Sequence, residues 1–80
     1  MIPVRGQVRV RASFDGEVEV KVTPGQRVYT GCALVVVEGE REIETLSARN
    51  PGSVREICIR DGAEAKKGDL LVVLDEDPVA

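Results

Sequence analysis

The feature that most constrains this sequence is that its second half repeats the pattern of its first half. Neither copy could bury an apolar face alone, so two copies are expected to pack together around a pseudo-two-fold axis. The spacing between equivalent residues is 36 and becomes 37 after one added residue between Gly52 and Gly62. The equivalent pairs are Ala12 and Ala48, Gly16 and Gly52, Val18 and Val54, Gly25 and Gly62, Gly31 and Gly68, Leu34 and Leu71, and Val36 and Val73.

Alternation of apolar and polar residues predicts half-buried strands in each copy. Pro24-Gly25 fits the central positions of a type II turn. The added residue of the second copy predicts a β-bulge where the first copy has a regular strand. The expected fold is an all-β small antiparallel β-sandwich or flattened barrel, a single domain over residues 1–80 with its core at about 8–75. The core-facing residues predicted from the alternation are Val8, Val10, Ala12, Val18, Val20 and Val22.

Residues 34–46 form a predicted hairpin at the centre of the chain. Its first arm is an apolar run rich in β-branched residues, too short for an independent helix and followed closely by Gly39. The last strand, residues 70–75, is the repeat partner of residues 34–38. The hairpin tip and the chain ends are therefore expected at opposite poles of the molecule.

Composition argues against several classes of function. The net charge of -3, with 11 basic and 14 acidic residues intermixed and only Phe14 and Tyr29 as aromatics, disfavours a nucleic-acid surface. No window is apolar enough for a membrane span or a signal peptide, so a cytoplasmic protein is expected.

Cys32 and Cys58 are isolated and fit free thiols in a reducing compartment. Histidine is absent, which removes the usual general base and transition-metal ligand and disfavours an enzyme.

An ordered set of turn and strand residues points to a known family. These are Asp15-Gly16, Pro24-Gly25 followed by Val28 and Gly31, residues 34–38, Pro51-Gly52, Gly62, and Lys67-Gly68-Asp69-Leu70. In these spacings the chain resembles the biotinyl/lipoyl carrier domains, the swinging-arm modules of biotin-dependent carboxylases and 2-oxoacid dehydrogenase complexes. The resemblance implies an antiparallel sandwich with the modified lysine at the tip of the central hairpin.

The acceptor position of that family falls on Arg41 when residues 38–52 are aligned without gaps. Biotinyl domains carry Glu-Ala-Met-Lys-Met there and lipoyl domains a form like Glu-Thr-Asp-Lys-Ala. Glu38 and Glu40 stand where the lipoyl pattern has Glu and Asp, so the hairpin is closer to the lipoyl form, and Glu40 and Glu42 replace both biotinyl methionines. Because guanidinium stays protonated, attachment of biotin or lipoate is expected to be absent. The alternative is that Arg41 is a solvated turn residue with no selected role.

Other candidate sites are weaker. Four carboxylates near the tip, those of Glu38, Glu40, Glu42 and Glu44, could hold a hard cation such as Ca²⁺. However, Arg41 lies among them and the ordered spacing of a calcium loop is absent, so no metal site is expected.

Ile43 is expected to point outward, where it could mark a contact surface, although single exposed apolar residues are common. The lysines, Lys21, Lys66 and Lys67, lie outside the hairpin, and Asp75, Glu76 and Asp77 are expected to form a solubilising tail.

The sequence therefore favours a non-enzymatic module that lacks the acceptor lysine and serves as an interaction or structural domain. A protein partner is expected to contact the hairpin surface formed by Glu38, Gly39, Glu40, Glu42 and Ile43. The alternative is a component of a carboxylase or dehydrogenase carrier system, with a subunit of that system as its partner. Neither a nucleic acid nor a membrane is expected as a partner.

Overall fold

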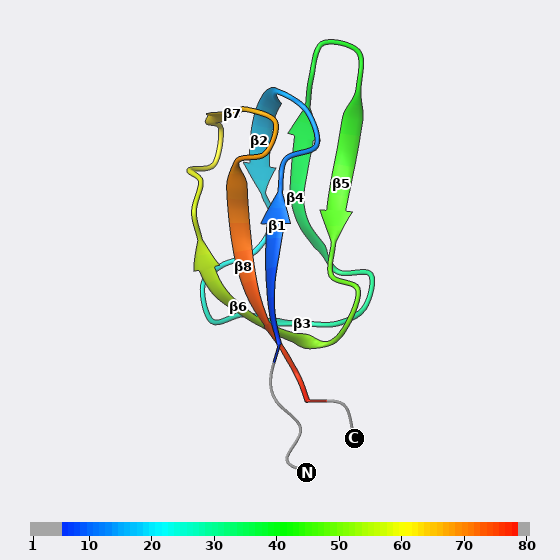
Figure 1. Ribbon diagram of the computed structural model, residues 1–80, viewed down its shortest axis with the longest axis vertical. Helices are drawn as coiled ribbons and strands as arrows, with labels where there is room; N and C mark the ends of the chain where they lie inside the picture. The colour runs from blue at the N-terminus through cyan, green and yellow to red at the C-terminus, as the bar shows by residue number, and fades with distance from the viewer. Residues whose placement is uncertain (1–5, 79–80) are drawn as a thin grey trace.

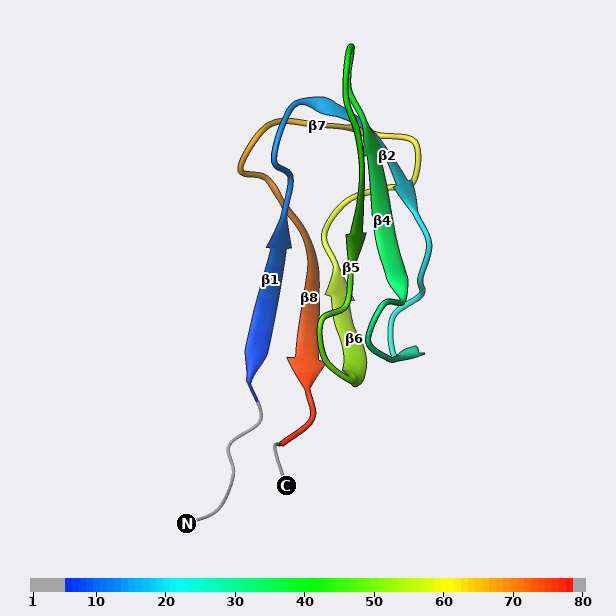
Figure 2. The ribbon, with the colours of Figure 1, turned by 90° about the vertical axis from the view of Figure 1, so that its right-hand side faces the viewer.

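The computed structural model describes residues 6–78, which form two antiparallel four-stranded sheets and contain no helix (Figure 1). The strands are β1 (Gln7–Arg11), β2 (Gly16–Val20), β3 (Arg27–Val28), β4 (Ala33–Glu38), β5 (Ile43–Ser47), β6 (Gly52–Ile57), β7 (Glu64–Ala65) and β8 (Leu70–Glu76). The strand orders are β1-β8-β6-β3 and β5-β4-β2-β7, and the sheets face each other as a sandwich (Figure 2). The predicted all-β fold is confirmed. Residues 6–78 contain no helix capable of crossing a membrane.

The two copies of the repeat are interleaved, because each sheet takes two strands from each copy. In the first copy, the backbone of Ala12 exchanges hydrogen bonds of 2.8 and 3.0 Å with Gly68 and Asp69 of the second. The equivalent residue Ala48 exchanges bonds of 2.8 and 2.9 Å with the turn at Gly31. The pseudo-two-fold relation predicted from the sequence is thus present in the hydrogen bonding.

Four glycines with positive φ, between 84° and 91°, close equivalent turns in the two copies: Gly25, Gly31, Gly62 and Gly68. The predicted type II turn at Pro24-Gly25 is confirmed, since the Gln26 N–H donates to the Thr23 carbonyl at 3.1 Å. The predicted bulge is also confirmed. The register between β6 and β8 shifts by one residue at Arg55, whereas the equivalent β2–β4 pairing is regular.

The core lies between the sheets and is made almost entirely of valine, leucine and alanine. Leu34 and Leu71 are equivalent bulged residues, skipped in the registers of β4 with β5 and of β8 with β1, and both are fully buried. Of the predicted core residues, Ala12, Val18 and Val22 are buried, while Val8, Val10 and Val20 pack against the core but remain partly exposed. The partial exposure of Val8 and Val10 arises because β1 is an edge strand.

The β4–β5 hairpin protrudes at one pole, and β1 begins and β8 ends at the other, as predicted (Figure 1). The expectation of a solubilising acidic tail is wrong. Asp75, Glu76 and Asp77 are partly buried, and Glu76 belongs to β8. Their side chains pair with Arg55 at 3.2 Å, Asn50 at 3.1 Å and Arg27 at 2.9 Å. The bond with Asp77 raises the pKa of the Arg27 guanidinium. These carboxylates therefore tie the chain end to β3, to β6 and to the turn before β6.

The close approach of β6 to β8 requires a glycine at position 52. A Cβ there would overlap the Asp75 carbonyl oxygen, whereas a Cβ at Gly6 would meet nothing within 4 Å. We expect Gly52→Ala to lower the free energy of unfolding by about 2 to 3 kcal/mol, in the upper part of the usual range for point mutations. Gly6→Ala should be nearly neutral. Urea unfolding followed by circular dichroism measures both changes. Equal midpoints for the two variants would contradict the close contact between Gly52 and the Asp75 carbonyl.

Candidate functional site at the hairpin tip

The tip of the central hairpin is a four-residue loop, 39–42, that closes on the paired residues Glu38 and Ile43. The Gly39 N–H donates to the Glu42 carbonyl at 2.8 Å, which fixes the turn across its neck. Arg41 is exposed at the end of this loop. Arg41 is thus an exposed residue of the loop between β4 and β5, which lies at the pole opposite the start of β1 and the end of β8 (Figure 1).

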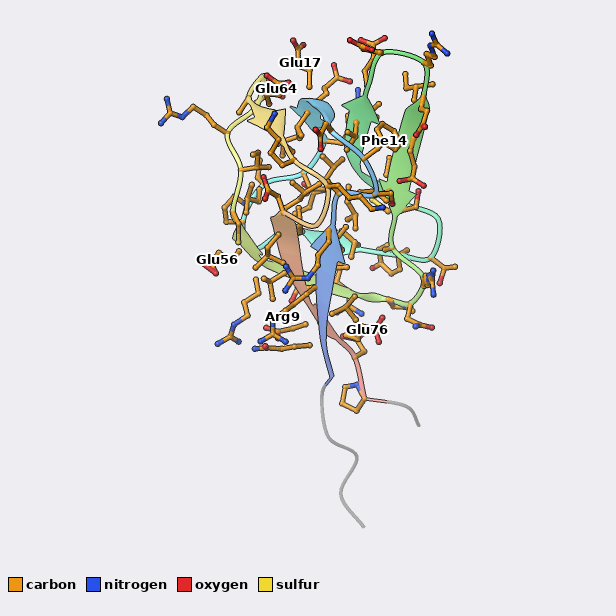
Figure 3. The ribbon with its side chains drawn as sticks, turned by 45° about the horizontal axis from the view of Figure 1, so that its top comes forward. Arg9, Phe14, Glu17, Glu56, Glu64 and Glu76 are labelled. Carbon is orange, nitrogen blue, oxygen red and sulfur yellow. The ribbon has the colours of Figure 1, made fainter. Side chains whose placement is uncertain are left out.

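The base of the hairpin is held by the loop between β1 and β2. A Cβ at Gly16 would lie 2.5 Å from the Glu38 carbonyl oxygen, and one at Gly39 would lie 3.0 Å from the Phe14 ring. Phe14 therefore packs directly against the start of the tip loop (Figure 3). The sequence predicts a turn at Asp15-Gly16 and does not indicate that Phe14 contacts the hairpin. The available signal is an aromatic residue, one of two in the chain, next to the predicted turn at Asp15-Gly16.

The carboxylates of the hairpin do not converge on one point. Glu38, Glu40 and Glu42 are exposed, whereas Glu44 faces the groove between β5 and β1, where its Oε1 is shielded from solvent and accepts no hydrogen bond from the described residues. No group of three or more carboxylate, thiol or imidazole side chains within residues 6–78 is placed to hold a metal ion. The four residues considered as calcium ligands are therefore not brought together.

The structure instead aligns carboxylates from three strands. Glu17 of β2 lies directly opposite Glu38 of β4 and Glu64 of β7, and all three are exposed on the outer face of their sheet. Figure 3 shows Glu17 and Glu64 together at the hairpin end of the molecule. Like charges directly opposite on neighbouring strands repel. The sequence could not reveal this row, because it depends on the register of strands far apart in the chain.

Ile43 is 68% exposed and stands beside this acidic row, opposite Glu38. The prediction that it points outward is confirmed. The tip end of the sheet therefore combines one exposed apolar side chain with several carboxylates, a surface suited to a partner that offers an apolar contact with positive charge around it.

Comparisons with known proteins agree with this architecture. A family model described as "Biotin-requiring enzyme" (Biotin_lipoyl) matches residues 4–74. The chain belongs to the biotinyl/lipoyl domain family. Among solved structures, a single-chain, multi-domain long-chain acyl-CoA carboxylase matches with a TM-score of 0.80 and 25% sequence identity. That match covers 90% of this chain and 7% of the carboxylase.

The lysines of this biotinyl/lipoyl domain lie away from the tip loop. Lys21 pairs with Glu19 at 2.6 Å. Lys66 and Lys67 lie in the turn before β8, where the Lys67 N–H donates to the Asp15 carboxylate at 2.7 Å. This turn lies at the hairpin end of the sandwich but belongs to a separate loop. Lys66 and Lys67 are therefore nearer to the hairpin in space than their distance along the sequence indicates.

The two cysteines are free and occupy different surroundings. Cys32 is partly buried beside the core and Cys58 is exposed after β6. Partial desolvation and the neighbouring Glu56 carboxylate raise the pKa of the Cys58 thiol. A raised pKa keeps the thiol protonated and lowers its reactivity near neutral pH.

Removal of the Glu56 charge should therefore make Cys58 more reactive. In Glu56→Gln, alkylation of Cys58 by iodoacetamide at pH 8 should be faster than in the wild type, because a lower thiol pKa raises the thiolate fraction. Peptide mass spectrometry over time measures the rate, and Glu19→Gln, on the other sheet, is the matched control. An unchanged rate in Glu56→Gln would show that desolvation alone sets this pKa.

Proposed function

We propose that this biotinyl/lipoyl domain carries no attached biotin or lipoate and acts as a non-catalytic binding module. The observation that carries the proposal is Arg41, exposed on the tip loop at the position that an ungapped alignment of residues 38–52 assigns to the family lysine. Attachment needs a nitrogen that can lose its proton and attack an activated acyl group. A guanidinium stays protonated and its lone pairs are delocalised, so Arg41 does not supply that nucleophile.

The placement of the lysines supports the same proposal. A ligase that recognises the hairpin tip would meet Arg41, whereas Lys66 and Lys67 lie on another loop whose backbone is held by Asp15. Lys21 lies just after β2, in an ion pair with Glu19. None of these three lysines lies in the tip loop, residues 39–42.

The likeness to a multi-domain acyl-CoA carboxylase supports a biotin-dependent carboxylase system as the setting. In that setting the module binds a carboxylase component through the tip surface of Glu38, Gly39, Glu40, Glu42 and Ile43. The second candidate setting is a 2-oxoacid dehydrogenase complex, which is supported by the lipoyl-like pattern at Glu38 and Glu40. Free Cys32 and Cys58 fit a reducing cytoplasm in either case.

Coexpression with a ligase tests the missing attachment point. The wild-type chain, expressed with biotin-protein ligase or with lipoate ligase, should gain no mass. Arg41→Lys should gain one lipoyl group, because it restores an amine on a correctly positioned hairpin with lipoyl-like flanks. Biotinylation should stay weak until Glu40 and Glu42 are also changed to methionine. Intact-mass spectrometry measures each outcome.

Two controls make the result decisive. Arg41→Gln removes the charge without adding an amine and should remain unmodified, and all variants should keep the wild-type thermal midpoint because the tip is exposed. Peptide mapping must place the added group on residue 41. Modification of the wild type at Lys66 or Lys67 would refute the proposal, and failure of the triple variant with both ligases would show that the tip is not presented as in the carriers.

A further inference from the structure

A groove of about 830 Å³ lies between β1 and β5, the edge strands of the two sheets. Side chains alternate along each strand, so those facing the groove are Val8 and Val10 on β1 and Glu44 and Leu46 on β5. At the repeat spacing of 36, Val8 corresponds to Glu44 and Val10 to Leu46. The two halves of the chain therefore place a valine and a glutamate at equivalent positions.

The Glu44 carboxylate lies in surroundings that suit an apolar side chain. Glu44 is opposite Val37 of β4, which is 1% exposed, just as its equivalent on β1 is opposite the buried Leu74 of β8. Its Oε1 is shielded from solvent and accepts no hydrogen bond from residues 6–78. A shielded acceptor without a donor lowers stability. Because valine fills the equivalent position, the fold does not require a carboxylate here, and a ligand that donates to it would account for it.

The charged residues around the groove do not supply this donor. The exposed arginines that line it are Arg9, Arg11 and Arg49. Among the described residues none of these arginines forms an ion pair with Glu44, and the Arg11 guanidinium donates instead to the Gly68 carbonyl at 3.0 Å. Glu76, the other carboxylate in the groove, accepts a hydrogen bond from Asn50 at 3.1 Å. Glu44 thus remains the carboxylate to be matched by a partner.

We propose that this groove receives a lysine side chain of a partner protein. The ammonium donates to Glu44 Oε1, and the four-carbon stem packs against Val8, Val10 and Leu46, which are partly exposed beside the core. A cation matches the carboxylate better than a neutral donor does, because a shielded charge needs an opposite charge. One shielded oxygen suits a compact ammonium rather than the planar fork of an arginine.

The arginines around the groove define the surroundings of that lysine. Arg9, Arg11 and Arg49 repel a basic surface and attract carboxylates, so the lysine that fits has acidic neighbours. The groove is distinct from the tip surface, since Ile43 and Glu44 point to opposite faces of β5. This inference goes beyond the proposed function and does not depend on it.

Peptide titration of the full chain, followed by amide NMR, tests the groove. The probes are acetyl-Asp-Lys-Asp-amide, acetyl-Ala-Lys-Ala-amide and acetyl-Asp-norleucine-Asp-amide. Each is added at constant ionic strength up to about 50 mM, because so small a contact is expected to bind in the millimolar range. The first peptide should shift the signals of residues 8–10 and 44–46 saturably. It should bind at least tenfold more tightly than the norleucine peptide, which lacks the ammonium, and more tightly than the alanine-flanked peptide.

Three results of this titration would overturn the proposal. These are no saturable shift with the first peptide, equal affinity for the norleucine peptide, and shifts confined to the acidic tip at residues 38–42. Equal affinity for the alanine-flanked peptide would refute the role of the arginines.

Matched variants separate binding from folding. Glu44→Val, which copies the equivalent residue of β1, should raise the urea midpoint because it removes the unpaired carboxylate. Glu44→Val and Glu44→Gln should both weaken binding of the first peptide at least tenfold. Glu42→Gln, the same change of charge on the exposed tip, should leave binding unchanged. A lower midpoint for Glu44→Val would reveal an internal partner of the carboxylate and overturn the proposal, as would undiminished binding by Glu44→Gln.

Discussion

The reciprocal backbone hydrogen bonds between the two halves of the chain are the constraint on which the rest of this structure depends. Ala12 is held by the turn at Gly68, and Ala48 by the turn at Gly31. Both turns require φ near 90°, which glycine adopts without steric cost. Because each half supplies strands to both sheets, neither half contains a complete sheet, and the valine and leucine core is shared. The hairpin protrudes from this rigid base and is positioned by it.

The hairpin combines a fixed base with an exposed end. Close contacts at Gly16 and Gly39 leave no room for side chains at its base, whereas residues 40–42 are solvated. A change in chemistry at the end, such as arginine in place of lysine, therefore requires no adjustment of the sandwich. The scaffold and the group that it presents are physically independent, which is why membership of the biotinyl/lipoyl family does not determine whether a domain carries a cofactor.

Much of this fold could be predicted from the sequence, because its determinants are local or repeated. The turn at Pro24-Gly25, the hairpin at residues 34–46 and the bulge in β6 all follow from short patterns, and the repeat supplied the pairing of the halves. The acidic row of Glu17, Glu38 and Glu64 could not be predicted, because it depends on the registers of three strands. The role of Asp75, Glu76 and Asp77 was missed for a related reason. Their partners are 20 to 50 residues away in the sequence.

The interleaving of the halves also has a consequence for how the chain reaches its native state. β1 finds its only pairing partner in β8, at the other end of the described chain, so the first strand stays incomplete until the last has formed. Closing such long loops costs conformational entropy before any contact repays it, and domains dominated by non-local pairings fold in milliseconds to seconds rather than microseconds. During synthesis β1 has no strand to pair with until the residues of β8, which begins at Leu70, have been added to the chain. Charged side chains discourage the pairing of exposed strand edges, and the exposed Arg9 and Arg11 place such charges on β1.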